Sequence, residues 1–300
     1  MPSWGDVRAE VNSAGSPFDV IRKRYAADLS DITGRNVILY YSGWLQKQHL
    51  LQHGLPVGVD DSDKNGFMAA IHGMDRSKGL DLFLHTPGGD VAATESLVDY
   101  IRAMFGTDVR AIVPQLAMSA GTMISLSCSQ VIMGKHSSLG PIDPQFGNMA
   151  AHGIVEEFER AKEEIKTDPS TIAVWQPIIA KYTPTLIGEA EKAINWANDM
   201  VKIWLTTGMF KDRTDPQADA EAVVRELGSH ALTLSHARHI SADKAKIHGI
   251  EVLDLESDPK LQEAVLTLHH ACIQTMSETP AFKIIENQEG VNFISAVKEA

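Results

Sequence analysis

The chain has 300 residues, 44% hydrophobic and 22% charged, a composition that is typical of a folded globular protein and that excludes disordered and collagenous classes. Its 27 Lys and Arg residues against 39 Asp and Glu residues give a formal net charge of −12, which repels phosphate backbones and argues against a nucleic-acid partner. The first 16 residues lack the apolar core of a signal peptide, and only two cysteines are present, so we expect a cytoplasmic location.

The first half of the chain alternates short apolar runs with segments of helical periodicity. The predicted strands are residues 37–41, 80–84, 109–113 and 130–133. The predicted helices between them are residues 67–74, 91–105 and 118–128. Strands that alternate with helices, and that are apolar along their whole length, are typical of a mostly parallel sheet with both faces covered. The sequence therefore predicts an α/β core over about residues 30–172.

One uncharged stretch, residues 111–134, is long enough to cross a bilayer. It contains Pro114, Gln115 and several serines, whose polar groups would be costly against lipid. We therefore expect this stretch to be buried inside the protein, and we expect no transmembrane segment.

The second half of the chain is predominantly helical in its pattern, with almost no strand signal. The predicted helices are residues 154–166, 172–182, 184–209, 215–228, 242–248 and 259–276. No linker rich in Ser and Gly separates the two halves, and no internal repeat is visible. We therefore expect one domain over residues 1–300, with a helical extension over about 173–300 that packs on the core or on a neighbouring subunit.

A Pro-Gly-Gly turn follows the strand predicted over residues 80–84. In the run His85-Thr-Pro-Gly-Gly-Asp90, Gly88 and Gly89 allow a sharp turn and bring backbone N–H groups close to a bound group. At a helix N-terminus such N–H groups point at an anion or at a developing oxyanion. The same pattern also occurs in turns without a function, so alone it does not decide between the two.

A serine stands at the next junction between strand and helix. Ser119, in the run Met118-Ser-Ala-Gly-Thr122, has the general logic of a nucleophile elbow, although the Gly-x-Ser-x-Gly pattern is absent. Successive turns of a parallel sheet emerge at the same edge, so Gly88, Gly89 and Ser119 are predicted to face one cleft. The alternative on this segment alone is a serine that caps a helix.

Three segments together, residues 82–90, 117–122 and 134–145, resemble the serine dehydrogenase proteinase family. That family belongs with signal peptide peptidase A and the proteolytic subunit of Clp protease in the Clp/crotonase fold. The resemblance covers residues 37–172 well and continues more loosely to residue 286. It implies a ββα superhelix core with a mostly parallel sheet, to which the helical C-terminal extension is added.

The resemblance implies that Ser119 is the acylated nucleophile of a serine peptidase that needs neither metal nor nucleotide. It also implies that the backbone amides of Gly88 or Gly89, together with Ala120, form the oxyanion hole. Two preorganised donors are what a tetrahedral intermediate requires. Peptides or proteins are the implied substrates, and a homo-oligomer is the implied assembly.

The general base is left open by the sequence, which offers a histidine and several lysines. His136 lies where the Clp pattern places its histidine, and Asp143 could orient it. Lys162 falls inside the apolar arc of the helix predicted over 154–166, where desolvation would lower the pKa of its ammonium toward that of a base; the alternative is that it extends to water. Lys181 lies roughly where signal peptide peptidase A carries its base.

Other histidines do not form a metal motif. His236, His239 and His248, with the pair His269-His270, lack the His-Glu-x-x-His spacing, so we expect no metal and no cofactor. Two other functions fit the same fold: an acyl-CoA enzyme of the crotonase type and a binding or scaffold protein without turnover.

Overall fold

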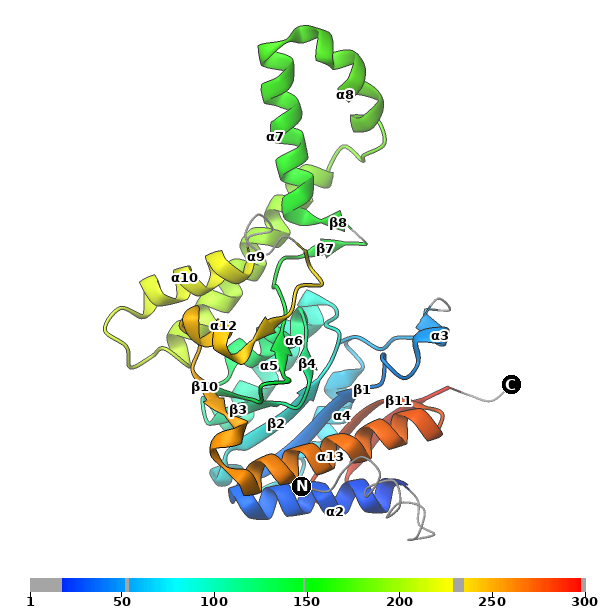
Figure 1. The fold of residues 1–300 in the computed structure, drawn as a ribbon, viewed down its shortest axis with the longest axis vertical. Helices are drawn as coiled ribbons and strands as arrows, with labels where there is room; N and C mark the ends of the chain where they lie inside the picture. Colours follow the sequence, from blue (N-terminus) through cyan, green and yellow to red (C-terminus); the bar gives the residue numbers. More distant parts are fainter. Residues whose placement is uncertain (1–17, 52–53, 148, 229–234, 298–300) are drawn as a thin grey trace.

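A seven-stranded sheet forms the centre of the computed structural model, which describes residues 18–51, 54–147, 149–228 and 235–297 (Figure 1). The strand order is β10-β5-β3-β2-β1-β11-β12. The parallel strands are β1 (Asn36–Ser42), β2 (Leu80–His85), β3 (Val109–Val113), β5 (Gln130–Met133) and β10 (Val252–Asp254). The strands β11 (Ala281–Asn287) and β12 (Asn292–Ala296) complete it, β11 being antiparallel to both β1 and β12. The prediction of an α/β fold with a mostly parallel sheet is therefore confirmed.

Alternation along the strands sends side chains to two separate cores. In β1, Ile38 and Tyr40 belong to one hydrophobic cluster, whereas Val37, Leu39 and Tyr41 belong to the other. The first face is covered by α4 (Asp63–Ile71), α5 (Val91–Phe105), α6 (Ala120–Ser127), α9 (Leu186–Thr207) and α10 (Pro216–Gly228). The opposite face is covered by α2 (Phe18–Thr33) and α13 (Pro259–Glu278), which pack against each other (Figure 1).

Short elements shape the rim of the sheet. The small strands are β4 (Leu116–Ala117), β6 (Ser138–Leu139), β7 (Gln145–Phe146), β8 (Met149–Ala150) and β9 (Ile240–Ser241). The short helices are α3 (Gln48–Leu51), η1 (Arg76–Lys78), α12 (Ala242–Ile247) and η3 (Leu255–Ser257). Of the small strands, β4, β6 and β9 pair into a second sheet, and this sheet fixes the loops that follow β3 and β5.

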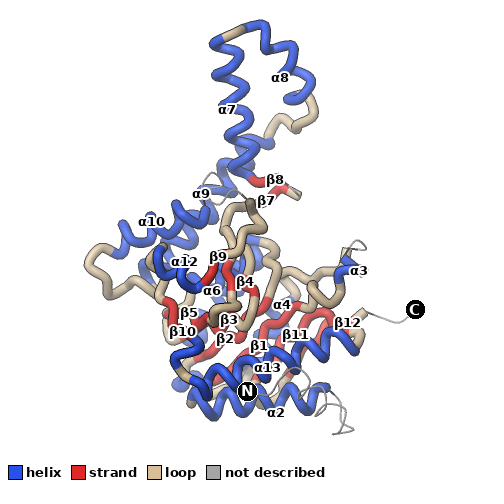
Figure 2. Tube along the Cα trace, viewed as in Figure 1, coloured by secondary structure: helices blue, strands red, loops and turns tan. Residues whose placement is uncertain are grey.

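A helical arm extends away from the sheet (Figures 1 and 2). It consists of α7 (Ala151–Thr167), the turn η2 (Pro169–Thr171) and α8 (Ile172–Ile179), and α9 leads back to the core. Its own cluster of buried residues is small: Ala151, Ile154 and Ala190. Most other side chains of α7 are therefore in contact with solvent.

The structure corrects the prediction that residues 173–300 form a helical extension. Strands β10 and β11 from this region belong to the central sheet, and β11 lies directly beside β1. The physical reason is that Lys283 and Glu286 interrupt the apolar run of β11, and these charges are buried because each has a partner of opposite charge. The sequence of β11 alone does not show which residues pair with Lys283 and Glu286, so it does not have the pattern of a buried strand.

Residues 111–134 are buried in the core, as expected, where they form most of β3, the turn at Ser119, α6 and β5. Within the described ranges, no helix combines the length and the apolar character needed to cross a membrane.

Candidate active site

Two loops at the carboxyl edge of the sheet are hydrogen-bonded to each other as neighbouring strands are. The Thr86 N–H donates to the Leu116 carbonyl at 3.0 Å, and the Met118 N–H donates to the Thr86 carbonyl at 3.0 Å. The Pro-Gly-Gly turn after β2 is thereby held beside the turn that carries Ser119. The sequence predicted that these two turns face one cleft, and the hydrogen bonds explain how they are held together.

A third segment fixes the Pro-Gly-Gly turn from its other side. The Val59 N–H donates to the Gly88 carbonyl at 2.8 Å, and the Asp90 N–H donates to the Val59 carbonyl at 2.9 Å. The Asp90 side chain then accepts from the Ala93 N–H at 2.8 Å and caps the N-terminus of α5. Both ends of the turn are therefore fixed.

Ser119 has a strained backbone. Its φ is +50° with ψ −114°, and it is the one non-glycine residue with positive φ in the parts of the chain that the structure describes. Such a conformation costs about 1–3 kcal/mol and persists only where the surrounding structure imposes it, most often at functional sites. The Gly121 N–H donates to the Met118 carbonyl at 2.8 Å and closes the turn around the serine. This geometry matches the nucleophile-elbow hypothesis better than that of a simple cap, because the Ser119 side chain makes no capping hydrogen bond.

Two backbone N–H groups near Ser119 are available as donors. Ala120 is the first residue of α6, so its N–H has no partner within the helix. The Gly89 N–H likewise donates no hydrogen bond to any residue that the structure describes. The Gly88 N–H, in contrast, donates to the Thr86 hydroxyl at 3.2 Å. Of the glycine amides that the sequence singled out, Gly89 is the better oxyanion donor by this criterion.

Gly88 has a steric role beside the serine. Its φ is +112°, and a Cβ at this position would lie 2.6 Å from the Cβ of Ser119 and 3.2 Å from its Oγ. Any other residue would be strained and would displace the Ser119 side chain. The glycine therefore permits the close approach of the two turns.

A histidine and an aspartate pair in the same region. The Nδ1 atom of His236 lies 2.8 Å from Oδ1 of Asp143, and the Asp143 side chain is fully buried. The Gln145 side-chain amide donates to the other carboxylate oxygen at 2.8 Å. Because an ionised carboxylate can only accept, Nδ1 carries a proton, and the Nε2 atom of a neutral His236 is free to accept one.

These groups meet in one cavity of about 420 Å³. Its lining includes Ser119, Asp143 and His236 together with Gly89. A neighbouring hollow of about 750 Å³ shares Pro87, Gln145, Gly147 and His236 with it. The two hollows are therefore adjacent, and Ser119 lines the smaller of them.

The lysines proposed as bases lie on or near the arm, and their side chains are exposed. Lys162 has 67% of its side chain exposed and pairs with Glu159 at 2.9 Å, so of the two alternatives left open for it, burial and extension to water, the structure shows the second. The hydrogen bond to Glu159 and the charge of that carboxylate raise the pKa of Lys162, opposite to what a general base needs. Lys162 is 11 positions beyond Ala151 on α7, roughly 16 Å along the helix axis. Lys181, after α8, is exposed as well, and neither lysine lines the cavity.

His136 lies toward the other face of the sheet. It is exposed, and together with burial its charge lowers the pKa of His270 on α13. Ser119 opens α6, which covers the opposite face, and His136 is absent from the lining of the cavity. Asp143, suggested as its partner, pairs with His236 instead.

From the sequence alone, we considered His236 only as a possible metal ligand, and we therefore missed this residue as a candidate general base. It lies 93 positions from Asp143, a separation that no local motif can reveal. The described residues contain no group of three or more His, Cys, Asp or Glu side chains that could hold a metal ion. His236 is thus the partner of a buried carboxylate.

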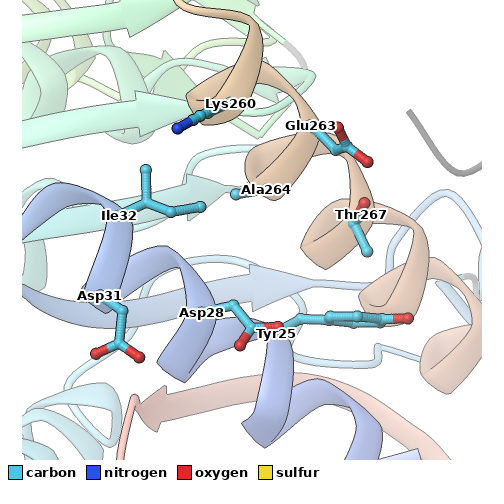
Figure 3. A pocket seen from close by; sticks show the side chains of 8 residues that line it. All are labelled: Tyr25, Asp28, Asp31, Ile32, Lys260, Glu263, Ala264 and Thr267. Carbon is cyan, nitrogen blue, oxygen red and sulfur yellow. The ribbon is translucent and has the colours of Figure 1, made fainter.

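A separate groove lies between α2 and α13, on the far side of the sheet from Ser119 (Figure 3). Its volume is about 450 Å³, and Figure 3 shows that Asp28 and Asp31 on α2 and Lys260 and Glu263 on α13 are among the side chains that line it. None of the side chains predicted for catalysis lines it. The groove is therefore distinct from the cavity around Ser119.

Comparison with known proteins identifies a family and two similar proteins. The family model described as "ClpP-like SDH-type serine proteinase" matches residues 46–288. An uncharacterized protein of Methanocaldococcus jannaschii, MJ0137, is 32% identical over 222 residues, which cover 72% of this chain and 66% of that protein. A second uncharacterized protein of the same organism, MJ1495, is 28% identical over 203 residues, covering 66% of this chain and 61% of that protein. The chain thus spans less than two thirds of the length of these relatives.

Proposed function

The chain belongs to the ClpP-like SDH-type serine proteinases, and from this premise we propose that it is an endopeptidase that cleaves peptide bonds through an acyl-enzyme on Ser119. The observation that carries the proposal is the presence of Ser119, Asp143 and His236 in the lining of one cavity. A serine hydroxyl is a weak nucleophile until a base within reach takes its proton. His236, oriented by Asp143, is the base we assign.

In the proposed mechanism the Nε2 atom of His236 takes the proton from the Ser119 hydroxyl as Oγ attacks the scissile carbonyl. The carbonyl oxygen becomes an oxyanion that accepts hydrogen bonds from the N–H groups of Gly89 and Ala120. Collapse of the tetrahedral intermediate breaks the C–N bond, and His236 gives its proton to the leaving amine. A water molecule, deprotonated by the same imidazole, then hydrolyses the ester and restores the Ser119 hydroxyl.

The cavity also favours a class of side chain next to the scissile bond. Met123, Ile142 and Trp196 line it with apolar surface. Burial of an apolar side chain of the substrate there is worth about 25 cal/mol per Å² removed from water. We therefore propose cleavage after medium-sized apolar residues, which digestion of a peptide library followed by mass spectrometry would measure.

The test of the base is covalent labelling of the purified protein with a fluorophosphonate, located by mass spectrometry. The proposal expects wild-type protein to be labelled at Ser119, and expects His236→Gln and Asp143→Asn to slow labelling at least ~100-fold. The matched variants Lys162→Ala, His136→Ala and Lys181→Ala test the bases that the sequence suggested, and they are expected to label at the wild-type rate. Labelling lost in Lys162→Ala and kept in His236→Gln would overturn the assignment of the base.

Failure of wild-type protein to label, while it remains folded by circular dichroism, would contradict peptidase activity itself. Weight would then pass to a scaffold protein or to an acyl-CoA enzyme with the same two-amide oxyanion hole. A cytoplasmic location and assembly into a homo-oligomer stay predictions, and size-exclusion chromatography with light scattering tests the second.

A further inference from the structure

A lysine is buried in the sheet, away from the proposed catalytic groups. Lys283 lies in β11 with 2% of its side chain exposed, and its Nζ atom is 2.6 Å from Oδ1 of Asp63 and 2.7 Å from Oδ2 of Asp60. The same ammonium donates to the Gly58 carbonyl at 2.9 Å. The ammonium therefore donates hydrogen bonds to Asp60 and to the Gly58 carbonyl and forms an ion pair with Asp63. Burying such an ion pair costs free energy of desolvation, so it is weak support for stability alone and points to a role in fixing one conformation.

The other oxygen of the Asp63 carboxylate, Oδ2, accepts two hydrogen bonds. The Tyr40 hydroxyl donates to Oδ2 at 2.7 Å, and the Asp60 N–H donates to the same oxygen at 3.0 Å. The Tyr40 hydroxyl also interacts with the side chain of Thr86, the residue that accepts from the Gly88 N–H. The network thus joins β1, the start of α4 and β11 to the beginning of the Pro-Gly-Gly turn.

The segment that Lys283 fixes is the one that fixes this turn. Gly58, whose carbonyl accepts from Lys283, is followed by Val59, which donates to the Gly88 carbonyl at 2.8 Å. The Gly58–Val59 segment and the Pro-Gly-Gly turn are in close contact. A Cβ on Gly58 would lie 2.9 Å from the Gly88 carbonyl oxygen, and a Cβ on Gly89 would lie 2.2 Å from the Val59 nitrogen.

The planarity of the peptide carries this restraint to the oxyanion hole. In the trans peptide between Gly88 and Gly89, the C=O and the N–H point in opposite directions. When Val59 binds the Gly88 carbonyl, the Gly89 N–H is turned away from Val59. A small rotation of this peptide would misdirect a donor whose effect depends on preorganisation.

We propose that Lys283 is a positioning residue for the oxyanion hole: its contacts with Asp60, Asp63 and the Gly58 carbonyl hold the Gly58–Val59 segment, which sets the direction of the Gly89 N–H. The inference rests on the proposed peptidase function, because it assigns a role to a residue that does not reach the substrate. It adds β11, which the sequence did not mark as part of the site, to the elements on which turnover depends.

The chain offers a matched control on the same strand. Arg22 on α2 is also fully buried and pairs with Glu286 of β11 at 2.5 Å, but it lies toward the other face of the sheet and has no contact with Gly58. Lys283→Met and Arg22→Met each remove one buried cation, and each leaves a buried carboxylate, Asp63 or Glu286, without its cationic partner. Both variants are expected to be less stable than wild type in urea. Only Lys283→Met is expected to change the direction of the Gly89 N–H.

The kinetic test compares kcat and KM on a fluorogenic peptide for these variants. We expect Lys283→Met to lower kcat ~10- to 100-fold with KM within ~3-fold of wild type, because removal of a full oxyanion donor costs ~10²- to 10³-fold. Arg22→Met is expected to keep kcat. The double variant Lys283→Met/Asp63→Asn relieves the unpaired charge, and kcat is expected to stay low. An unchanged kcat in Lys283→Met, or an equal fall in both single variants, would overturn the proposal.

A second readout does not depend on peptidase activity. Hydrogen–deuterium exchange followed by mass spectrometry reports on the backbone of peptides that contain residues 86–90. We expect faster exchange there in Lys283→Met than in wild type and no change in Arg22→Met. Unchanged exchange in Lys283→Met refutes the positioning role, whereas faster exchange in a protein without any peptidase activity refutes the proposed function and keeps the positioning role.

Discussion

Acid should destabilise the protein through His85, the last residue of β2. Its ring is completely buried, with Nδ1 3.1 Å from the Ser42 carbonyl and Nε2 3.3 Å from the Gln115 side-chain oxygen. The ring centroids of Tyr41 and Trp44 each lie 4.4 Å from the ring centroid of His85. Burial lowers the pKa of His85 from 6.5 to about 4, although the two hydrogen bonds act in the opposite direction.

The direction of the pH effect follows from this lowered pKa. Between about pH 6.5 and about pH 4 the unfolded chain carries a proton on His85 that the folded chain does not, so the free energy of unfolding falls as pH falls. At about 1.4 kcal/mol for each unit of pKa, the loss is about 2 kcal/mol at pH 5 and about 3 kcal/mol at pH 4, relative to pH 7.5. The pKa of His269, which burial and the charge of His85 also lower, adds to the same trend.

The assay is urea unfolding at pH 7.5, 6 and 5 for wild type, His85→Gln and the control His72→Gln. His72 is exposed, so its variant should keep the wild-type dependence on pH. His85→Gln should be less stable at pH 7.5 but should lose about 2 kcal/mol less than wild type between pH 7.5 and pH 5. Equal losses in His85→Gln and wild type would refute the assignment of this pH dependence to the buried ring.

Three further predictions concern the site. Gly88→Ala places a Cβ 2.6 Å from the Cβ of Ser119, so kcat in a peptidase assay should fall at least ~100-fold. The control is Gly106→Ala, at a glycine that also has a positive φ, +62°, but has open space around it; it should lower the free energy of unfolding in urea by about 1 kcal/mol and keep kcat. Ser119→Ala should cleave no substrate, so that liquid chromatography detects no product peptides. Asp143→Asn should lower kcat at least ~100-fold across the pH–rate profile, because the amide no longer holds the Nδ1 proton of His236.

Each of these has an outcome that contradicts it. Wild-type turnover in Gly88→Ala would mean that the two turns can separate without loss of geometry. Product release from Ser119→Ala would assign the nucleophile elsewhere. A full wild-type profile in Asp143→Asn would show that the aspartate only stabilises the loop.

The parts of the site that the sequence predicted are those determined locally. A buried strand followed by a serine among small residues and then by a helix places Ser119 at the edge of the sheet without knowledge of any distant contact. The same holds for Gly88 and Gly89, because the turn must be sharp and the next helix begins at Val91. Strand positions in the first half of the chain were predicted correctly for the same reason.

Lys162 shows where periodicity stops being informative. The apolar stripe on α7 identifies a face of the helix, and it cannot reveal how much of that face another element covers. In the arm only Ala151, Ile154 and Ala161 of α7 are buried, because α8 and α9 provide little surface against it. A lysine beside a partly covered stripe extends to solvent and pairs with Glu159.

His236 and Lys283 required the fold because their roles depend on partners far along the chain. Lys283 is 220 positions from Asp63 and interrupts an apolar run, which reduces the strand signal of β11 in a scan for hydrophobicity. The same interruption is informative once the strand is known to be buried, because a buried charge requires a partner. Here Lys283 also donates to the Gly58 carbonyl and so contacts the Gly58–Val59 segment. A charged residue inside an otherwise apolar strand is thus a marker of a long-range contact, and in this protein that contact ends at the proposed oxyanion hole.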